Sequence, residues 1–239
     1  MFNDPLSMQP VAVVRSPFKE KFGIPRQPGL ANSMISTVEL LPEFSSAEAV
    51  RGLEQCSHIW LLFVFSECVD KGWSSLVRPP RLGGNKKLGV FASRSPFRPN
   101  PVGLSPVRLE AVRVEGNKVS LDVRGADLLD GTPILDIKPY LPYSDSIPEA
   151  EFGIADKIEL LSLPVDFSEQ AVTVCERYQK VYGSNLAEQI SELLRCDPRP
   201  AYKKNDTERM YGIKLYDLDV RWKIDDSRII VEQIQPLSE

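Results

Sequence analysis

Residues 58–66 read HIWLLFVFS. Residues 59–65 are all apolar and form the longest apolar run of the chain. The run is rich in β-branched and aromatic side chains, which is typical of a central, buried β-strand. It falls far short of the ~20 apolar residues that span a bilayer, so no membrane-spanning segment is expected. We therefore expect a fold built around this strand.

Short strands separated by Gly and Pro turns are expected on both sides of this run. Residues 9–14, 34–41, 88–92 and 133–137 each have the pattern of a short strand, and residues 47–53 that of a short helix. Residues 107–123 indicate a hairpin around Gly116-Asn117, and a change of apolar phase near Ala111 indicates a bulge. Many short strands with such turns predict a β-barrel or a strongly curved sheet over residues 1–150.

The character of the sequence changes after Pro148. Apolar side chains recur at helical spacing in two segments, at Ala171, Val174, Cys175 and Tyr178, and at Leu186, Ile190, Leu193 and Leu194. Asp166 or Ser168 can cap the first helix, and Asn185 with Glu188 approximates a capping box for the second. Residues 211–224 then have the pattern of a strand whose apolar phase switches near Tyr216, and residues 228–234 that of its partner. We expect residues 151–239 to form a small α+β domain, so that the chain is mainly β with α.

The charge is distributed unevenly. The formal net charge is −4, yet residues 71–109, called the basic block below, contain eight Lys or Arg and no Asp or Glu. The rest of the chain therefore carries −12. A local basic segment in an acidic protein is an electrostatic footprint for an anion, of which phosphate is the commonest. A solvated charged face is the alternative, but this segment is rich in Pro, Gly and aromatic residues.

Cysteine and histidine usage argues against a metal site. The four cysteines are widely spaced without a C-x-x-C pair, and His58 is the only histidine. Four reduced thiols are typical of a cytoplasmic protein, and the first ten residues do not resemble a signal peptide. A lone histidine also provides no Ser-His-Asp set, so we expect His58 to be a packed structural residue.

Three loops place charged side chains on backbone stiffened by proline. They read RQPG at residues 26–29, RSPFRPNP at residues 94–101, and DGTP at residues 130–133, which leads into DIKPY at residues 136–140. Rigid presentation lowers the ordering cost of binding, and sites on β scaffolds usually lie on loops. Neither a G-x-G-x-x-G nor a Walker A motif is present. We therefore expect a binding site of another kind at these loops.

The proline loops carry a family resemblance. VFASRSPFRPNP at residues 90–101 closely resembles the signature of the TsaA-like (TrmO) family, and residues 15–22, 25–29, 63–65 and 127–140 match it as well. DPRPAY at residues 197–202 resembles the bacterial, two-domain branch. The resemblance implies a homodimer of β-barrel methyltransferase domains, each with a small C-terminal domain. It implies S-adenosylmethionine as cofactor and, as substrate, tRNA with N6-threonylcarbamoyladenosine just 3′ of the anticodon, which receives an N6-methyl group.

The same resemblance implies a set of cofactor contacts: Arg26, Gln27, Pro28, Ser66, Glu67, Arg94, Leu104, Arg124, Gly125, Ala126 and Asp127. The residue types suit the cofactor. Its carboxylate matches Arg94 as a charge-assisted partner, and the turn at residues 124–127 offers backbone groups and a carboxylate to adenine and ribose. Because methyl transfer is an in-line displacement, the protein contributes mainly alignment and electrostatics.

Proton removal is a separate requirement, because the urea-like acceptor nitrogen is a poor nucleophile, and either a base or an oxygen of the substrate itself should remove the proton. We expect Asp136 and Tyr140 to handle the proton, with Lys138 as the partner of an anion. A structural ion pair between Asp136 and Lys138 is an equally good interpretation.

The tRNA anticodon loop is the expected macromolecular partner. Cations of the basic block would hold its backbone, namely Arg78, Arg81, Lys86, Lys87 and Arg98. Trp73, Phe97 or Tyr140 could stack on unpaired bases, although core burial is the usual role of an aromatic residue. Two other functions stay open from the residues alone: a non-catalytic RNA-binding or regulatory module on the barrel, and methyl transfer to another small acceptor.

Overall fold

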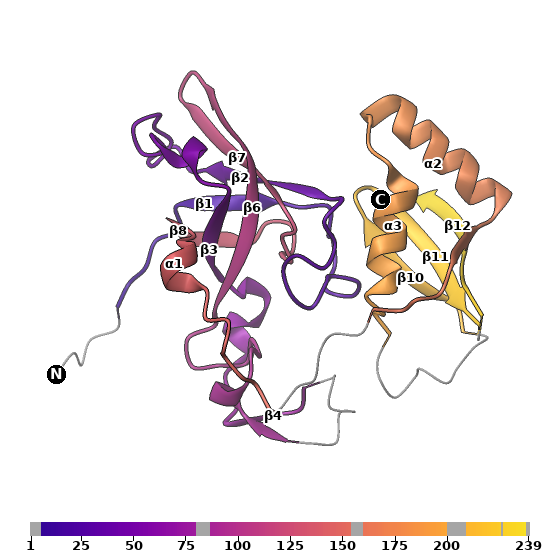
Figure 1. The fold of residues 1–239 in the computed structure, drawn as a ribbon, viewed down its shortest axis with the longest axis horizontal. Helices are drawn as coiled ribbons and strands as arrows, with labels where there is room; N and C mark the ends of the chain where they lie inside the picture. Colours follow the sequence, from indigo (N-terminus) through magenta and orange to yellow (C-terminus); the bar gives the residue numbers. More distant parts are fainter. Residues whose placement is uncertain (1–5, 80–86, 154–159, 200–208, 226, 238–239) are drawn as a thin grey trace.

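A closed barrel of six antiparallel strands forms the N-terminal part of the computed structural model, which describes residues 6–79, 87–153, 160–199, 209–225 and 227–237. Around the barrel the order is β1-β2-β7-β6-β3-β8 (Figure 1). The strands are β1 Ala12–Arg15, β2 Ile35–Leu40, β3 His58–Val64, β6 Val102–Glu115, β7 Lys118–Arg124 and β8 Pro133–Pro139. The expectation of a mainly β fold with an N-terminal barrel is confirmed.

The apolar run forms β3, which is paired on both sides, with β6 and with β8. Ile59, Leu61 and Phe63 point into the barrel and are at most 5% exposed. Trp60 and Leu62 point outward and are only half-buried. The strand is therefore central as predicted, but it is not buried on both faces, because a barrel wall has one inner and one outer side.

The predicted hairpin is confirmed, with a register shift between Leu109 and Ala111 where the apolar phase changes. Its first strand begins earlier than expected, at Val102, and runs through Gly103 and Pro106. A Cβ atom at Gly103 would lie 2.6 Å from Cε2 of Phe63, so the inner wall has room only for glycine there.

All three proline loops leave the barrel at one end. Because the strands alternate in direction, β1, β3 and β7 finish at the end where β2, β6 and β8 begin. This end, called the loop end below, carries residues 16–34, 65–101 and 125–132. The second of these segments contains η2 Ser66–Lys71, β4 Leu76–Val77, β5 Leu88–Gly89 and η4 Val90–Ala92.

Two local predictions differ from the structure. Residues 47–53 form successive turns that lead into a single 3-10 turn, η1 Leu53–Gln55, rather than a helix. Gly52, with φ of 88°, interrupts any continuous helix there. The expected strand at residues 88–92 is only two residues long before η4 begins. After β8, α1 Pro142–Asp145 lies at the opposite end of the barrel.

The C-terminal part is a four-stranded sheet with two helices. Its order is β10-β11-β12-β9, formed by β9 Val165–Phe167, β10 Tyr211–Leu215, β11 Leu218–Ile224 and β12 Ile229–Pro236. The helices are α2 Glu169–Tyr182 and α3 Leu186–Arg195, and their predicted caps are confirmed: Ser168 accepts from the Ala171 amide, and Asn185 accepts from the Glu188 amide. The single strand expected at residues 211–224 is wrong, since the phase switch at Tyr216 marks the turn between β10 and β11.

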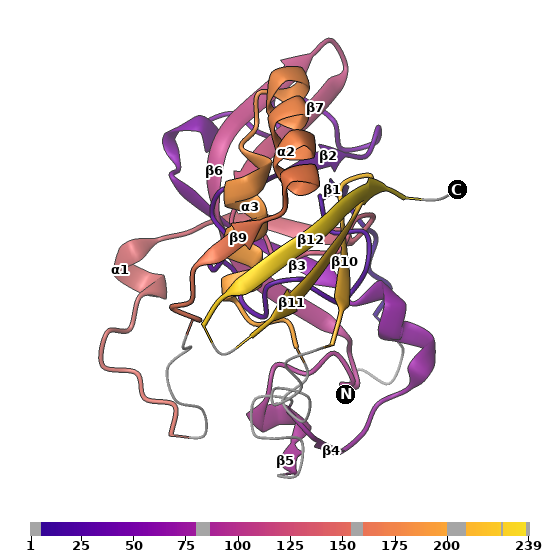
Figure 2. The same ribbon diagram turned by 90° about the vertical axis from the view of Figure 1, so that its right-hand side faces the viewer.

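Helix α3 lies on the side of the C-terminal sheet that faces the barrel (Figures 1 and 2). The segment at residues 16–34 joins the two parts. Phe18 bridges Leu215, and its side chain is buried within the C-terminal core. The boundary at residue 150 falls between α1 and β9 and stays a prediction. Within the described residues, no helix is long and apolar enough to cross a membrane.

Candidate functional site

Two segments of the loop end approach each other closely. The Gly29 amide donates to the Gly125 carbonyl at 2.8 Å, and Arg124 Nη1 donates to the Asn32 carbonyl at 2.8 Å. Gly125 has φ of 77°, and a Cβ atom there would lie 2.9 Å from Oδ1 of Asn32. Only glycine therefore allows residues 124–127 to pack against residues 26–32.

Arg94 connects the other predicted loop to this pair. Its Nη1 donates to Oε1 of Gln27 at 2.8 Å, while the rest of the side chain is exposed. Hydrogen bonds inside the loop hold the segment that carries Arg94. Arg98 Nη1 donates to the carbonyls of Ser93 at 3.1 Å and Ser95 at 3.4 Å. An exposed guanidinium is thus held in a fixed direction, as binding of an anion requires.

A carboxyl group lies near this guanidinium. Ser105 Oγ, on β6, donates to Oδ1 of Asp127 at 2.6 Å. Burial raises the pKa of Asp127, and the hydrogen bond from Ser105 and the charge of Arg94 oppose that rise. The loop end therefore presents a cationic group and a partly buried carboxyl group together.

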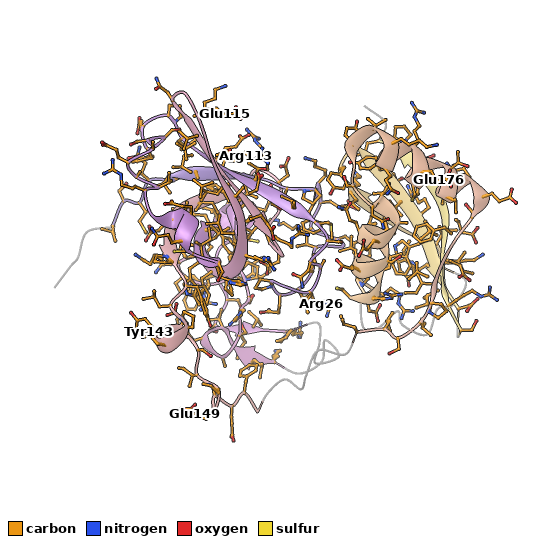
Figure 3. The ribbon with its side chains drawn as sticks, turned by 45° about the horizontal axis from the view of Figure 1, so that its top comes forward. Arg26, Arg113, Glu115, Tyr143, Glu149 and Glu176 are labelled. Carbon is orange, nitrogen blue, oxygen red and sulfur yellow. The ribbon has the colours of Figure 1, made fainter. Side chains whose placement is uncertain are left out.

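The remaining predicted cofactor residues lie at several places on the loop end and the adjoining barrel wall. Ser66 and Glu67 begin η2 directly after β3, and Lys21 pairs with Glu67 at 3.7 Å. Leu104, opposite Leu62, is 52% exposed on the outer wall. Pro28 and Ala126 lie within the two packed segments. Arg26 lies at the border of the two parts of the molecule, where its Nη2 donates to the Arg199 carbonyl at 3.4 Å (Figure 3).

The predicted proton handlers lie along β8. Asp136 is opposite Leu62, and Lys138 is opposite Trp60, so both are on the outer wall. Their side chains form an ion pair at 2.9 Å and are 45% and 61% exposed. This pairing agrees with the structural interpretation and leaves the catalytic one a proposal.

Tyr140 lies apart from the loop end. Its amide donates to the His58 carbonyl at 3.0 Å, and its ring contacts Trp60 at 5.6 Å between centroids. It follows β8, about 23 Å along the strand from Pro133, so it belongs to the opposite end of the barrel. His58 is exposed there rather than packed, with Nδ1 3.0 Å from Oγ of Ser57. One chain therefore brings Gln27, Arg94 and Asp127 together but not Tyr140.

Two of the predicted RNA-binding cations flank the small β4-β5 sheet. Val77 pairs with Leu88, so Arg78 and Lys87 lie beside each other just beyond this pair, and both are exposed. Arg81 and Lys86 lie outside the described residues. Arg98 is half-buried, because its guanidinium is engaged with its own loop.

Exposed aromatic side chains are found in the same loop-end segment, residues 65–101. Trp73 is 58% exposed, Phe97 40% and Phe91 77%. Phe91 was missed from the sequence, because its position in a short apolar segment is equally typical of a core residue. Within the described residues, no group of three or more His, Cys, Asp or Glu could hold a metal ion.

Comparison with known families matches both parts of the chain. The model of the tRNA-methyltransferase O N-terminal domain matches residues 13–146, and that of the TrmO C-terminal domain matches residues 161–237. The chain belongs to the tRNA-methyltransferase O family. The range that matches the TrmO N-terminal domain contains all three proline loops and the whole barrel except Ala12.

Relatives of known name and structure are similar over nearly the full length. A tRNA (adenine(37)-N6)-methyltransferase of Escherichia coli is 45% identical, and the match covers 95% of this chain and 96% of the relative. A putative S-adenosylmethionine-dependent methyltransferase RcsF of Pseudomonas aeruginosa is 50% identical, covering 90% and 91%. The crystal structure of TrmO from Pseudomonas aeruginosa superimposes with a TM-score of 0.80 at 41% identity, covering 97% and 99%.

Proposed function

We propose that this protein transfers a methyl group from S-adenosylmethionine to N6 of an adenosine in tRNA. The acceptor is N6-threonylcarbamoyladenosine just 3′ of the anticodon. The observation that carries the proposal is the convergence of Gln27, Arg94 and Asp127 at the loop end of a TrmO barrel. The names of the E. coli and P. aeruginosa relatives support the activity and the cofactor.

The chemistry of the loop end fits this cofactor. S-adenosylmethionine, when bound, supplies an electrophilic methyl group on a sulfonium centre. Arg94, oriented by Gln27, binds a carboxylate, and Asp127 accepts hydrogen bonds from amino or hydroxyl groups. The other proposed contacts are Arg26, Pro28, Ser66, Glu67, Leu104 and residues 124–127.

Asp136, Lys138 and Tyr140 are the proposed proton-handling groups. Methyl transfer needs reacting atoms about 3–3.5 Å apart, whereas Tyr140 is at the far end of β8 from the loop end. A homodimer resolves this separation if the outer wall of one barrel meets the loop end of the other. The exposed Leu104, at 52%, is an apolar side chain on that wall.

Mixing two inactive variants tests the shared site. Random mixing of equal amounts makes about half of the dimers a pair of Arg94→Ala with Tyr140→Phe. Each mixed dimer has one site with both residues intact and one with neither, so about a quarter of wild-type activity should return. Mixed dimers that form but stay inactive would contradict a shared site and leave the cofactor site as proposed.

The anticodon stem-loop of tRNA is the proposed partner of the basic block, through Arg78, Lys87 and Arg98, together with Arg81 and Lys86. We place the enzyme in the cytoplasm, which the four free cysteines support. Binding should weaken steeply with salt, because phosphate contacts release counterions.

Mass spectrometry of nucleosides tests the activity. Purified protein with S-adenosylmethionine should convert N6-threonylcarbamoyladenosine, in tRNA from a strain that lacks this activity, to its N6-methyl form. Arg94→Ala should abolish conversion but keep tRNA binding, whereas Arg51→Ala, at an exposed ion pair with Glu48, should leave both unchanged. Binding of tRNA without any methylation by the wild type would favour the non-catalytic RNA-binding module instead.

A further inference from the structure

A cavity of about 590 Å³ lies between the barrel and the C-terminal domain. Asn32 and Arg124 line it from the barrel side, and Ser184, Asn185 and Tyr216 line it from the C-terminal side. Its size is within the range of small-molecule sites. No predicted cofactor residue other than Arg124 lines it, so the cavity is distinct from the Gln27–Arg94 centre.

Tyr216 is held in this cavity in an unfavourable backbone conformation. Its φ is 56°, in the left-handed region that glycine and asparagine favour in turns. Its amide donates to the Pro17 carbonyl at 2.7 Å, and its hydroxyl donates to Oε1 of Gln189 at 3.2 Å. A bulky residue kept at such a turn by the surrounding structure points to a role for its ring.

The ring of Tyr216 belongs to a series of three tyrosines. Its centroid is 5.5 Å from that of Tyr178, which is 4.5 Å from that of Tyr182. Tyr182 is 62% exposed, so the series runs from the cavity to the surface. Proteins use exposed aromatic rings to stack unpaired nucleobases, whatever the base.

Polar groups around Tyr216 suit the edge of a base better than a phosphate. Asn185 and Ser184 offer an amide and a hydroxyl, which can donate and accept hydrogen bonds. Arg124 is fixed at the wall by Glu110 and the Asn32 carbonyl. Glu188 and Glu192 also line the cavity, and their charges disfavour an anion.

We propose that this cavity receives an unpaired base of the RNA substrate, placed against Tyr216. The inference rests on the proposed function and extends it, because it gives the C-terminal domain a part in substrate binding. Arg124 lines the cavity and also begins the proposed cofactor segment at residues 124–127. The bound nucleotide therefore lies beside the methylation site, as a neighbour of the target adenosine in the anticodon loop would.

Three variants distinguish a role of the Tyr216 ring in RNA binding from a role in stabilising the fold. Ser184→Trp fills the cavity, Tyr216→Asn removes the ring with a residue that tolerates positive φ, and Tyr216→Phe keeps the ring. Val181→Trp is the matched control, because Val181 is 64% exposed on α2 and does not line the cavity. The measurements are tRNA affinity at several salt concentrations, calorimetry with S-adenosylmethionine, and thermal melting.

We expect Ser184→Trp and Tyr216→Asn to weaken tRNA binding by roughly 5- to 150-fold, the range that base stacking gives. Their salt slopes should stay at the wild-type value, because neither change removes a cation from the RNA-binding surface. Val181→Trp should match the wild type, and so should cofactor binding by all variants. Tyr216→Phe should bind tRNA more tightly than Tyr216→Asn, because it keeps the ring. Wild-type tRNA affinity in both Ser184→Trp and Tyr216→Asn would overturn the cavity inference while leaving the proposed function intact. A wild-type protein that binds neither cofactor nor tRNA would overturn both.

Discussion

The hydrogen bond between Arg94 and Gln27 gives a quantitative test of the cofactor site. Arg94→Ala removes the charge proposed to bind the donor's carboxylate. A hydrogen bond to a charged group contributes about 1.5–3 kcal/mol, so the Kd for S-adenosylmethionine should rise about 10- to 150-fold. Gln27→Ala leaves the guanidinium but removes the acceptor 2.8 Å away that orients it. That change should cost about 0.5–1.5 kcal/mol, or about 2- to 12-fold.

The double variant decides whether Gln27 acts through Arg94. If it does, Arg94→Ala with Gln27→Ala should bind the cofactor no more weakly than Arg94→Ala alone, which gives a coupling of about 0.5–1.5 kcal/mol. Calorimetry on the wild type, both single variants and the double variant measures it, with Arg51→Ala as an exposed control. Additive effects would remove the positioning role of Gln27. A Kd for Arg94→Ala within about twofold of the wild type would refute the proposed site.

Three further predictions address the scaffold and the RNA surface. Burial would raise the pKa of Asp130, but hydrogen bonds and nearby cations lower this pKa overall. The ionised carboxylate therefore stabilises the fold at pH values above the pKa of the unfolded state, and this stabilisation is lost as the pH falls through the pKa of the folded state. Asp130→Asn should therefore cost about 1–2 kcal/mol in urea unfolding at pH 7 and less at pH 3, and an equal cost at both would contradict this. Gly103→Ala places a Cβ atom 2.6 Å from Cε2 of Phe63 and should destabilise the barrel by about 1–3 kcal/mol. The melting temperature should fall, and an unchanged melting temperature would contradict the prediction. Replacing Arg78 and Lys87 by Gln should reduce the salt slope of tRNA binding by about 0.7–0.9 for each phosphate that is no longer neutralised, and an unchanged slope would remove both from that surface.

Much of the fold follows from the spacing of apolar residues, which recur every second residue in strands and about every 3.6 residues in helices. The hairpin, its bulge and the two capped helices each have a local sequence signal, and the tertiary structure agrees with that signal. The turn at Tyr216 was not predicted, because tyrosine is not a residue type that indicates a turn with positive φ. The helix expected at residues 47–53 failed for the opposite reason. Within that segment only Val50 is buried, so no apolar stripe holds a helix against the barrel.

The site was predictable in its loops but not in its geometry. Proline-stiffened charged loops predicted the segments that carry Gln27 and Arg94 in the candidate site. The hydrogen bond from Ser105 to Asp127 was not predictable, because it depends on a strand that begins five residues before its expected start. The separation of Tyr140 from the loop end depends on the length and direction of β8, which no side-chain pattern encodes. Long-range placement of this kind comes from strand order and register.

An acidic protein can still direct a polyanion to one face if the cations on that face lack carboxylate partners while those elsewhere have them. Outside the basic block, many cations are compensated within the fold, as in the pairs Arg15–Glu39 and Lys223–Glu232. Arg78 and Lys87 take part in no ion pair among the described residues. Cations near residues 78 and 87 are therefore less compensated than Arg15 and Lys223, so we expect a polyanion to approach from this side. If the basic block binds RNA as proposed, salt should weaken this orientation together with the attraction, because it screens both fields.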